Sequence, residues 1–103
     1  MTPEQRLLNL LGLAQRAGKL VSGEPMVLAA IKEQKLNLLF LASDMGASSM
    51  KKLSDKATYY EVPLNTTLTV EQLSQATGRQ RFAIGVNDRG FARKMQTLLD
   101  NMK

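Results

Sequence analysis

The sequence contains neither cysteine nor histidine. These absences exclude disulfide frameworks, thiol nucleophiles, thiolate or imidazole metal sites, and Ser-His-Asp triads. No Walker P-loop and no G-x-G-x-x-G phosphate-binding pattern occurs either. Any chemistry would have to use Asp, Glu, Lys, Ser, Tyr or Arg side chains. We therefore expect a protein that is not an enzyme and that carries no metal ion or cofactor.

Long hydrophobic runs are also missing. Apolar stretches such as residues 38–42 are far too short to cross a bilayer, and no signal peptide is visible. The chain has 103 residues, of which 44% are hydrophobic and 22% are charged, as in an ordinary globular domain. These features predict one cytoplasmic domain over residues 1–103, with no membrane partner.

Positive charge is in excess. Fourteen Lys and Arg residues against nine Asp and Glu residues give a formal net charge of +5. Such a balance favours an anionic partner, and nucleic acid is the commonest one. A net charge of this size also serves the solubility of a small domain. Charge alone therefore favours nucleic-acid binding without specifying a site.

The first part of the chain alternates between helix and strand patterns. Thr2 and Gln5 form a capping box before a helix of regular apolar spacing, and Gly18 lies where a left-handed cap closes such a helix. An extended link at residues 19–21 leads to a second helix, which runs from residues 22–25 to about Gln34. Residues 36–42 form an almost continuous apolar run, which is typical of a strand covered on both faces.

Helical spacing returns at Met45. Residues 59–62, which Pro63 stops, are predicted to form a strand because aromatic and β-branched residues favour strands. Thr69 begins a further capped helix that ends at Gly78.

Residues 82–86 then form a predicted strand, and residues 88–102 form a last helix. The methionines Met26, Met50 and Met95 all fall at predicted core positions. This alternation predicts an α/β fold with helices on both faces of one sheet.

Ligands of open α/β sheets gather where strands end and helices begin, because free N–H groups and the helix dipole favour anions there. Three segments fit this description: residues 22–25, 43–46 and 87–90. Residues 78–81 form a fourth candidate, a basic loop that enters a strand. Each segment has a simpler interpretation as a helix cap or a solvated loop.

Asp44 and Asp88 are most simply interpreted as helix caps. Two aspartates at strand ends also allow an alternative, a Mg²⁺ site like that of phospho-acceptor domains. Such a site needs several converging acids, and only Glu24 lies near the first predicted strand. The alternative is therefore weaker than capping.

Several basic residues are candidates for phosphate contact. Arg79 and Arg81 flank Gln80 on a loop opened by glycine, which suits bidentate contact with phosphate or guanine. Arg16 and Lys19 flank Gly18, where cations also suit the end of a helix dipole. The lysines of the third helix are more simply a solvated face; they are Lys51, Lys52 and Lys56.

Four segments together resemble the kink-turn-binding ribosomal protein superfamily of archaea and eukaryotes, and most closely its small bacterial YlxQ-like branch. They are residues 13–23 (LAQRAGKLVSG), 30–32 (AIK), 38–44 (LLFLASD) and 73–81 (LSQATGRQR). The resemblance covers nearly the whole chain. It implies a three-layer α/β/α sandwich with a four-stranded mixed sheet. It also implies binding to sharply bent RNA, in which tandem sheared G·A pairs follow a short bulge.

The family's contact residues carry over only in part. Family members read the guanines with a glycine, an Asn-Glu pair and a lysine at the start of the second helix. Gly23 matches the glycine, whereas Pro25, Met26 and Ala29 occupy the other three positions. Ser43 and Asp44 match the polar pair after the second strand. Residues 78–82 match the loop that packs under the bulged nucleotides.

The sequence thus predicts a monomeric protein that binds kinked or bulged RNA, ribosomal or otherwise structured, and no small-molecule substrate. The alternative is a protein-interaction module that keeps the fold and has lost RNA reading. The predicted RNA-binding residues are Arg16, Lys19, Ser22, Gly23, Glu24, Pro25, Ser43, Asp44, Gly78, Arg79, Gln80 and Arg81.

Overall fold

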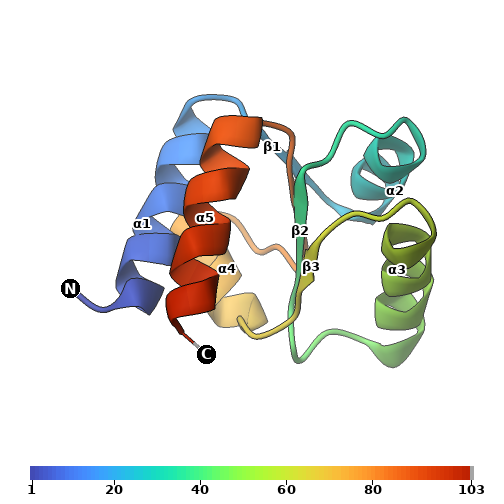
Figure 1. Cartoon of the computed structure of the whole chain (residues 1–103). Coiled ribbons are helices and arrows are strands. Elements are labelled where there is room, and N and C mark those ends of the chain that lie inside the picture. The colour runs from blue at the N-terminus through green and yellow to red at the C-terminus, as the bar shows by residue number, and fades with distance from the viewer. Residues whose placement is uncertain (103) are drawn as a thin grey trace.

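The computed structural model describes residues 1–102 as five helices around a four-stranded sheet (Figure 1). The elements in chain order are α1 (Pro3–Arg16), β1 (Leu20–Ser22), α2 (Glu24–Lys32), β2 (Leu38–Leu41), α3 (Ala47–Tyr59), β3 (Leu64–Asn65), α4 (Val70–Thr77), β4 (Ala83–Val86) and α5 (Arg89–Asn101). No helix in residues 1–102 combines the length and hydropathy that crossing a membrane requires.

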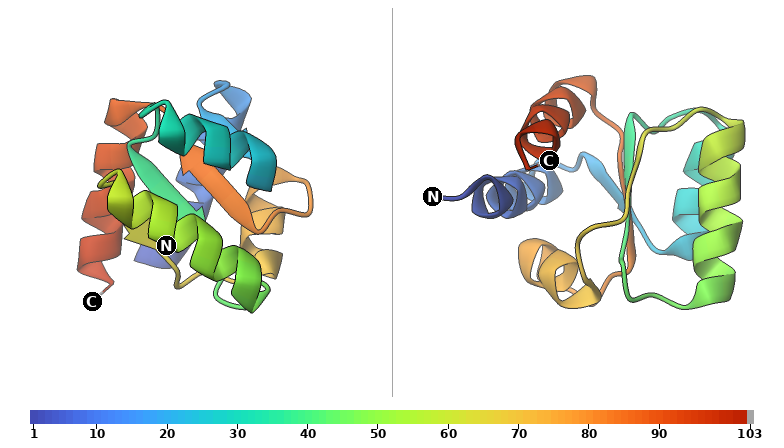
Figure 2. Two further views of the ribbon diagram at one scale, coloured as in Figure 1. Left: turned by 90° about the vertical axis from the view of Figure 1, so that its right-hand side faces the viewer. Right: turned by 60° about the horizontal axis from the view of Figure 1, so that its bottom comes forward.

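The sheet is mixed, with strand order β1-β4-β2-β3. Strand β4 runs antiparallel to both of its neighbours, whereas β2 and β3 are parallel. Helices α1, α4 and α5 cover one face and α2 and α3 cover the other, so three layers are visible in the right-hand view of Figure 2. The predicted three-layer α/β/α sandwich with a four-stranded mixed sheet is confirmed.

The core consists of two hydrophobic clusters, one on each face of the sheet. Along β2, Leu38 and Phe40 enter the cluster under α1, α4 and α5, while Leu39 and Leu41 enter the cluster under α2 and α3. All four side chains are buried because side chains alternate between the faces of a strand. This position of β2 explains why its sequence is an almost continuous apolar run, as predicted for a strand covered on both faces.

Local capping signals set the helix starts as predicted. Thr2 and Gln5 form the capping box of α1, and Thr69 and Gln72 form that of α4. The helices α1 and α4 end at glycines with positive φ, 73° at Gly18 and 78° at Gly78. These backbone conformations favour glycine, because glycine has no Cβ to clash with the backbone there.

The strand predicted at residues 59–62 is wrong. Tyr59 is the last residue of α3, and Glu61 adopts a left-handed φ of 58° that turns the chain. The Val62 N–H then donates to the Ala57 carbonyl at 2.8 Å, which buries Val62 in the core. The short strand β3 begins only after Pro63. A similar left-handed residue, Gln34, follows α2, so that helix ends at Lys32.

Two of the three methionines expected in the core are at least partly buried, and the third is not. Met95 is fully buried and Met50 is half-buried, but the side chain of Met26 is 64% exposed at the start of α2. A small angular offset along the first turn is enough to turn a helical residue from the sheet to solvent.

Candidate nucleic-acid interface

The direction of β4 decides which loops meet. Because β4 is antiparallel to β1 and β2, the segment that enters β4 lies where β1 and β2 end. The Gly23 N–H donates to the Ala83 carbonyl at 3.2 Å, and the Ala42 N–H donates to the Phe82 carbonyl at 2.9 Å. We call this the loop end of the sheet, formed by residues 22–25, 43–46 and 78–82. In the left view of Figure 2 its three segments lie together, beside the first turns of α2 and α3.

The start of α2 is open. Gly23 is the N-cap residue, with φ 91°, and no side chain within residues 1–102 caps this helix. Ser22 belongs to β1, so the interpretation of its hydroxyl as a helix cap is wrong. Glu24 is half-buried and Pro25 is exposed, and both lie in the first turn. The backbone at Gly23 is therefore accessible to a base or a phosphate without a Cβ in the way.

Asp44 does cap a helix, but not the one that follows it. Its Oδ1 accepts a hydrogen bond from the Val70 N–H of α4 at 2.9 Å, while the Ser43 N–H donates to the Leu68 carbonyl at 2.8 Å. Ser43 and Asp44 thereby join the end of β2 to the start of α4. Helix α3 begins instead at Gly46, without a side-chain cap.

Asp88 lies at the other end of the sheet, where β4 finishes. Its Oδ2 accepts from the Phe91 N–H at 2.8 Å and caps α5, as predicted. Asp44 and Asp88 follow strands that run in opposite directions, so they do not converge. Within residues 1–102 no three His, Cys, Asp or Glu residues gather to hold a metal ion. The Mg²⁺ alternative therefore loses its geometric basis.

The loop at residues 78–82 is held against α4. The backbone N–H of Arg81 donates to the Ser74 hydroxyl at 3.0 Å, and the Arg79 carbonyl accepts from the Thr77 hydroxyl at 3.2 Å. Arg79 and Gln80 are exposed and Arg81 is half-buried. The Arg81 guanidinium makes a hydrogen bond of 3.2 Å to the adjacent Gln80 carbonyl, and no carboxylate in the described residues pairs with it. Both arginines are therefore available to an anion.

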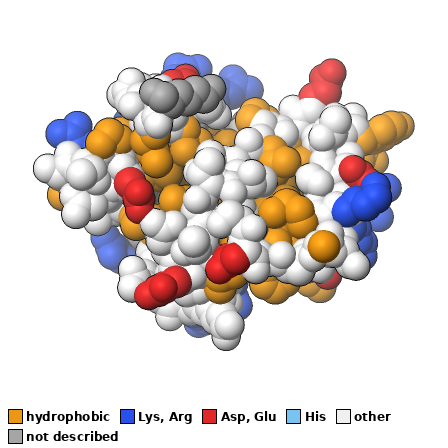
Figure 3. All heavy atoms as spheres, turned by 90° about the horizontal axis from the view of Figure 1, so that it is seen from below, with side chains coloured by type: hydrophobic (Ala, Val, Ile, Leu, Met, Phe, Trp, Pro, Cys, Tyr) orange, Lys and Arg blue, Asp and Glu red, His pale blue; other side chains and the backbone are white. Residues whose placement is uncertain are grey.

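Two hollows lie on either side of this loop. The first, which we call the Phe82 hollow, has a volume of about 500 Å³ and is lined by Met45, Gly46, Ser49, Val70, Gln80 and Phe82. The second, the Arg79 hollow, has a volume of about 550 Å³ and is lined by Val70, Glu71, Ser74, Gln75, Gly78, Arg79 and Gln80. Gln80 lines both. In the view from below, Lys and Arg side chains lie mainly around the margin and hydrophobic groups show nearer the middle (Figure 3).

Two residues of the Phe82 hollow, Ser49 and Val70, lie outside the segments that the sequence singled out. Phe82 itself was assigned to a strand, but β4 begins one residue later and the Phe82 side chain is 37% exposed. Met45 and Gly46 belong to the candidate segment 43–46, although only Ser43 and Asp44 of that segment were predicted to bind RNA. Val70 is brought to the hollow by its long-range contact with Asp44, which no local pattern indicates.

Arg16 and Lys19 lie three residues apart, at the carboxyl end of α1 and just before β1. Arg16 lines a groove of about 490 Å³ between α1 and α4 together with Gln75, which also lines the Arg79 hollow. Lys19 precedes β1 and its carbonyl accepts from the Asn87 N–H at 3.0 Å, at the opposite end of the sheet from Gly23. Lys19 therefore does not lie at the loop end, and Arg16 is connected to the loop end only through the groove that it lines together with Gln75.

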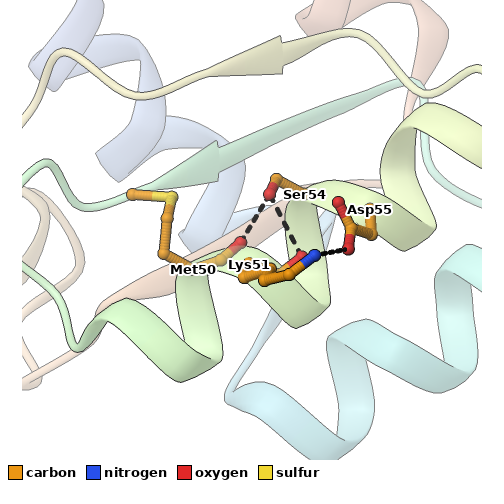
Figure 4. Close-up of polar contacts among 4 residues, drawn as sticks. All are labelled: Met50, Lys51, Ser54 and Asp55. Carbon is orange, nitrogen blue, oxygen red and sulfur yellow. Dashed lines mark hydrogen bonds and ion pairs between the residues drawn. The ribbon is translucent and has the colours of Figure 1, made fainter.

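On α3 one lysine is already paired. The Lys51 ammonium contacts the Asp55 carboxylate at 2.8 Å, one helical turn away (Figure 4). This hydrogen bond, together with the charge of Asp55, raises the pKa of Lys51. The Ser54 hydroxyl donates back to the Met50 carbonyl at 2.6 Å. Lys52 and Lys56 have no such partner within residues 1–102.

The family model described as "Ribosomal protein L7Ae/L30e/S12e/Gadd45 family" matches residues 5–95. The chain belongs to this family, and the resemblance drawn from the sequence is confirmed. Among its relatives is a protein named "RNA-binding protein YlxQ" from Enterococcus faecium, 40% identical over 96 residues, which are 93% of each chain. A protein of the same name from Bacillus subtilis (strain 168) is 40% identical over 88% of this chain and 92% of its own.

Two solved structures show the same architecture. A protein with unknown function from Bacillus halodurans C superposes with a TM-score of 0.87 at 41% identity, over 91% of this chain and 96% of that one. The Giardia lamblia 15.5kD RNA binding protein superposes with a TM-score of 0.82 over 96% of this chain and 86% of that one, at 14% identity. The second likeness shows the fold alone.

Proposed function

We propose that this protein is a non-catalytic, single-domain RNA-binding protein that docks kinked or bulged RNA onto the loop end of the sheet. The observation that carries the proposal is the convergence of the uncapped start of α2, the Ser43-Asp44 corner and the loop at residues 78–82. The names of the two relatives at 40% identity support RNA as the partner. The protein acts as a monomer in the cytoplasm, on ribosomal or another structured RNA.

Each part of the loop end has a distinct task in this proposal. The Phe82 hollow receives an unstacked base, because bulged nucleotides expose their faces to aromatic and apolar side chains. Gln80 supplies amide groups to a base edge. Arg79 and Arg81 hold phosphates on either side of it. The protein holds the bend and carries out no chemical step.

The start of α2 then contributes through its backbone and its apolar surface. Pro25, Met26 and Ala29 occupy the positions where the resembling family has its base-reading side chains, and all three are exposed. They offer van der Waals contact in place of hydrogen bonds. Gly23 and Glu24 supply the polar groups of this turn, the Gly23 backbone by close approach and Glu24 by its carboxylate. The expected recognition is therefore one of RNA shape more than of base identity.

The test is a titration of two fluorescent RNA duplexes, one with a kink-turn and one in which Watson–Crick pairs replace the tandem G·A pairs, at two salt concentrations. We expect at least about tenfold tighter binding to the kinked RNA, equivalent to about 1.4 kcal/mol, at both salt concentrations. Equal binding to the two duplexes that weakens steeply with salt would contradict shape recognition.

A second candidate function is a protein-interaction module on the same fold. The exposed Met26 at the start of α2 favours it, because an apolar side chain there suits a protein surface as well as a base. The salt dependence of the binding affinity distinguishes the two functions. Binding through an apolar protein interface changes little with salt, whereas RNA binding loses affinity with each phosphate contact that salt screens.

A further inference from the structure

The end of the sheet opposite the loop end carries its own group of cations. There the carboxyl end of β4 meets the residues before β1 and β2: the Asn87 N–H donates to the Lys19 carbonyl at 3.0 Å, and the Asn37 N–H donates to the Val86 carbonyl at 2.8 Å. In Figure 1 the end of α1, the start of α5 and the start of β2 meet at the top of the molecule. We call this the basic end, formed by Lys19, Asn37 and residues 87–93.

A hollow at the basic end brings two arginines together with two amides. It has a volume of about 190 Å³, and Arg89, Arg93, Asn37 and Gln96 line it together with the apolar residues Pro63 and Ala92. We call it the Arg89 hollow. Arg89 and Arg93 stand one turn apart on α5, so their side chains project from the same face. The hollow thus presents guanidinium and amide donors and no carboxylate.

The charges of these arginines are not balanced from within the described residues. Neither guanidinium takes part in an ion pair or hydrogen bond within residues 1–102. The neighbouring Asp88 carboxylate is engaged with the Phe91 N–H, and Glu33 is paired with Lys35 at 3.0 Å. Like charges at this helical spacing weaken a helix, so the pair does not serve folding. An anion placed between the two guanidinium groups removes that repulsion.

We propose that the basic end is a second RNA-binding surface, which binds backbone phosphates through Arg89 and Arg93, with Lys19 at the same end of the sheet. Guanidinium groups bind phosphate oxygens in a bidentate manner, and Asn37 and Gln96 add donors. Phosphate contacts carry no sequence information, so binding here is independent of sequence and of the kink. The surface uses none of the loop-end residues, and β4, about 13 Å long, separates the two.

Such a protein holds two RNA segments at once, with a bent segment at the loop end and a regular helix at the basic end. The first arm of the experiment titrates a Watson–Crick RNA duplex without a kink. We expect Arg89→Gln/Arg93→Gln to weaken its binding about tenfold and to lower the log–log salt slope by about 2, one for each lost phosphate contact. The Arg89→Lys/Arg93→Lys variant keeps most of the affinity.

The matched control is Lys52→Gln/Lys56→Gln on α3. It removes the same charge from two exposed residues at the same helical spacing. If the two double variants lose the same affinity for the duplex, net charge alone explains the effect and the proposal is overturned. An unchanged affinity in Arg89→Gln/Arg93→Gln, or a wild-type protein that does not bind the regular duplex, would also overturn it. Urea unfolding of each variant shows whether it is folded. If the double glutamine variant is not, the single variants Arg89→Gln and Arg93→Gln serve, and each is expected to lower the log–log salt slope by about 1.

The second arm adds the regular duplex to protein already saturated with kinked RNA, with a different fluorophore on each RNA. Wild-type protein is expected to form a ternary complex, and Arg89→Gln/Arg93→Gln is expected to stop at the binary complex with the kinked RNA. Displacement of the kinked RNA by the duplex would overturn the proposal, because it would place both RNAs on one surface. If the kink gives no preference but the first arm succeeds, the function proposed for the loop end fails and the basic end stands.

Discussion

At the loop end of the sheet, two hollows lie beside a glycine-opened helix, and only two arginines stand close to them. At the basic end, two arginines line one small hollow, and Lys19 lies at the same end of the sheet. The loop end therefore offers the larger hollows, whereas the basic end offers mainly positive charge. A net charge of +5 therefore does not identify the surface where RNA would be recognised, since charge contributes affinity and shape contributes selectivity.

Replacing one arginine at each end of the sheet with alanine is expected to have the largest effect. We expect Arg81→Ala to weaken binding of kinked RNA by about 1 to 3 kcal/mol while leaving the regular duplex nearly unaffected. Arg89→Ala is expected to weaken binding of the regular duplex and to leave kinked RNA nearly unaffected, because Arg89 contacts phosphates of the regular helix only. Titrations of both RNAs measure the two effects. An unchanged affinity of Arg81→Ala for kinked RNA would remove Arg81 from the site.

A second prediction concerns the backbone at the loop end. Gly23 has φ 91°, and a Cβ added there would have no atom of a non-adjacent residue within 4 Å, so Gly23→Ala meets backbone strain and no clash. We expect it to lower the free energy of unfolding by about 1 to 3 kcal/mol more than its control. Gly46→Ala is that control, because Gly46 is also an uncapped N-cap residue but has φ −60°. Urea unfolding measures both variants. Equal decreases in the free energy of unfolding would show that a side chain at position 23 causes no backbone strain.

Capping explains which parts of the fold could be predicted from the sequence. The pairs Thr2–Gln5 and Thr69–Gln72 interact across three residues, so their signals are complete within a short window. The strand predicted at residues 59–62 failed for a related reason. Its aromatic and β-branched residues match a strand, and nothing local reveals that Glu61 turns the chain.

The candidate site was predictable only as far as its segments. Residues 22–25, 43–46 and 78–81 were all singled out, and the structure brings them together. The sequence could not assign Lys19 to the far end, because that depends on the antiparallel direction of β4. It could not assign Asp44 to α4 either, since its partner Val70 is 26 residues away.

Asp44 and Asp88 offer a third, smaller comparison between the two ends. Each carboxylate caps one helix, so Asp44→Ala and Asp88→Ala are each expected to lower the free energy of unfolding by about 1 kcal/mol. Asp44→Ala is expected to cost less, because the Thr69 hydroxyl still accepts from the Gln72 N–H of α4. Thermal unfolding with and without Mg²⁺ checks both points. A rise in Tm with Mg²⁺ that Asp44→Ala abolishes would restore the metal site as a hypothesis.

The smallest effect is expected for Lys51, the lysine that already has a carboxylate partner. Its raised pKa means that pairing with Asp55 stabilises the fold below the pKa of an unfolded-state lysine, and that this contribution is lost as the pH rises through the folded-state pKa. Because both side chains are exposed, solvent screens the pair and leaves little to lose. Urea unfolding curves of wild type and Lys51→Gln should therefore coincide from neutral to strongly alkaline pH. A gap between them that closes only at alkaline pH would show that the pair contributes more than its exposure allows.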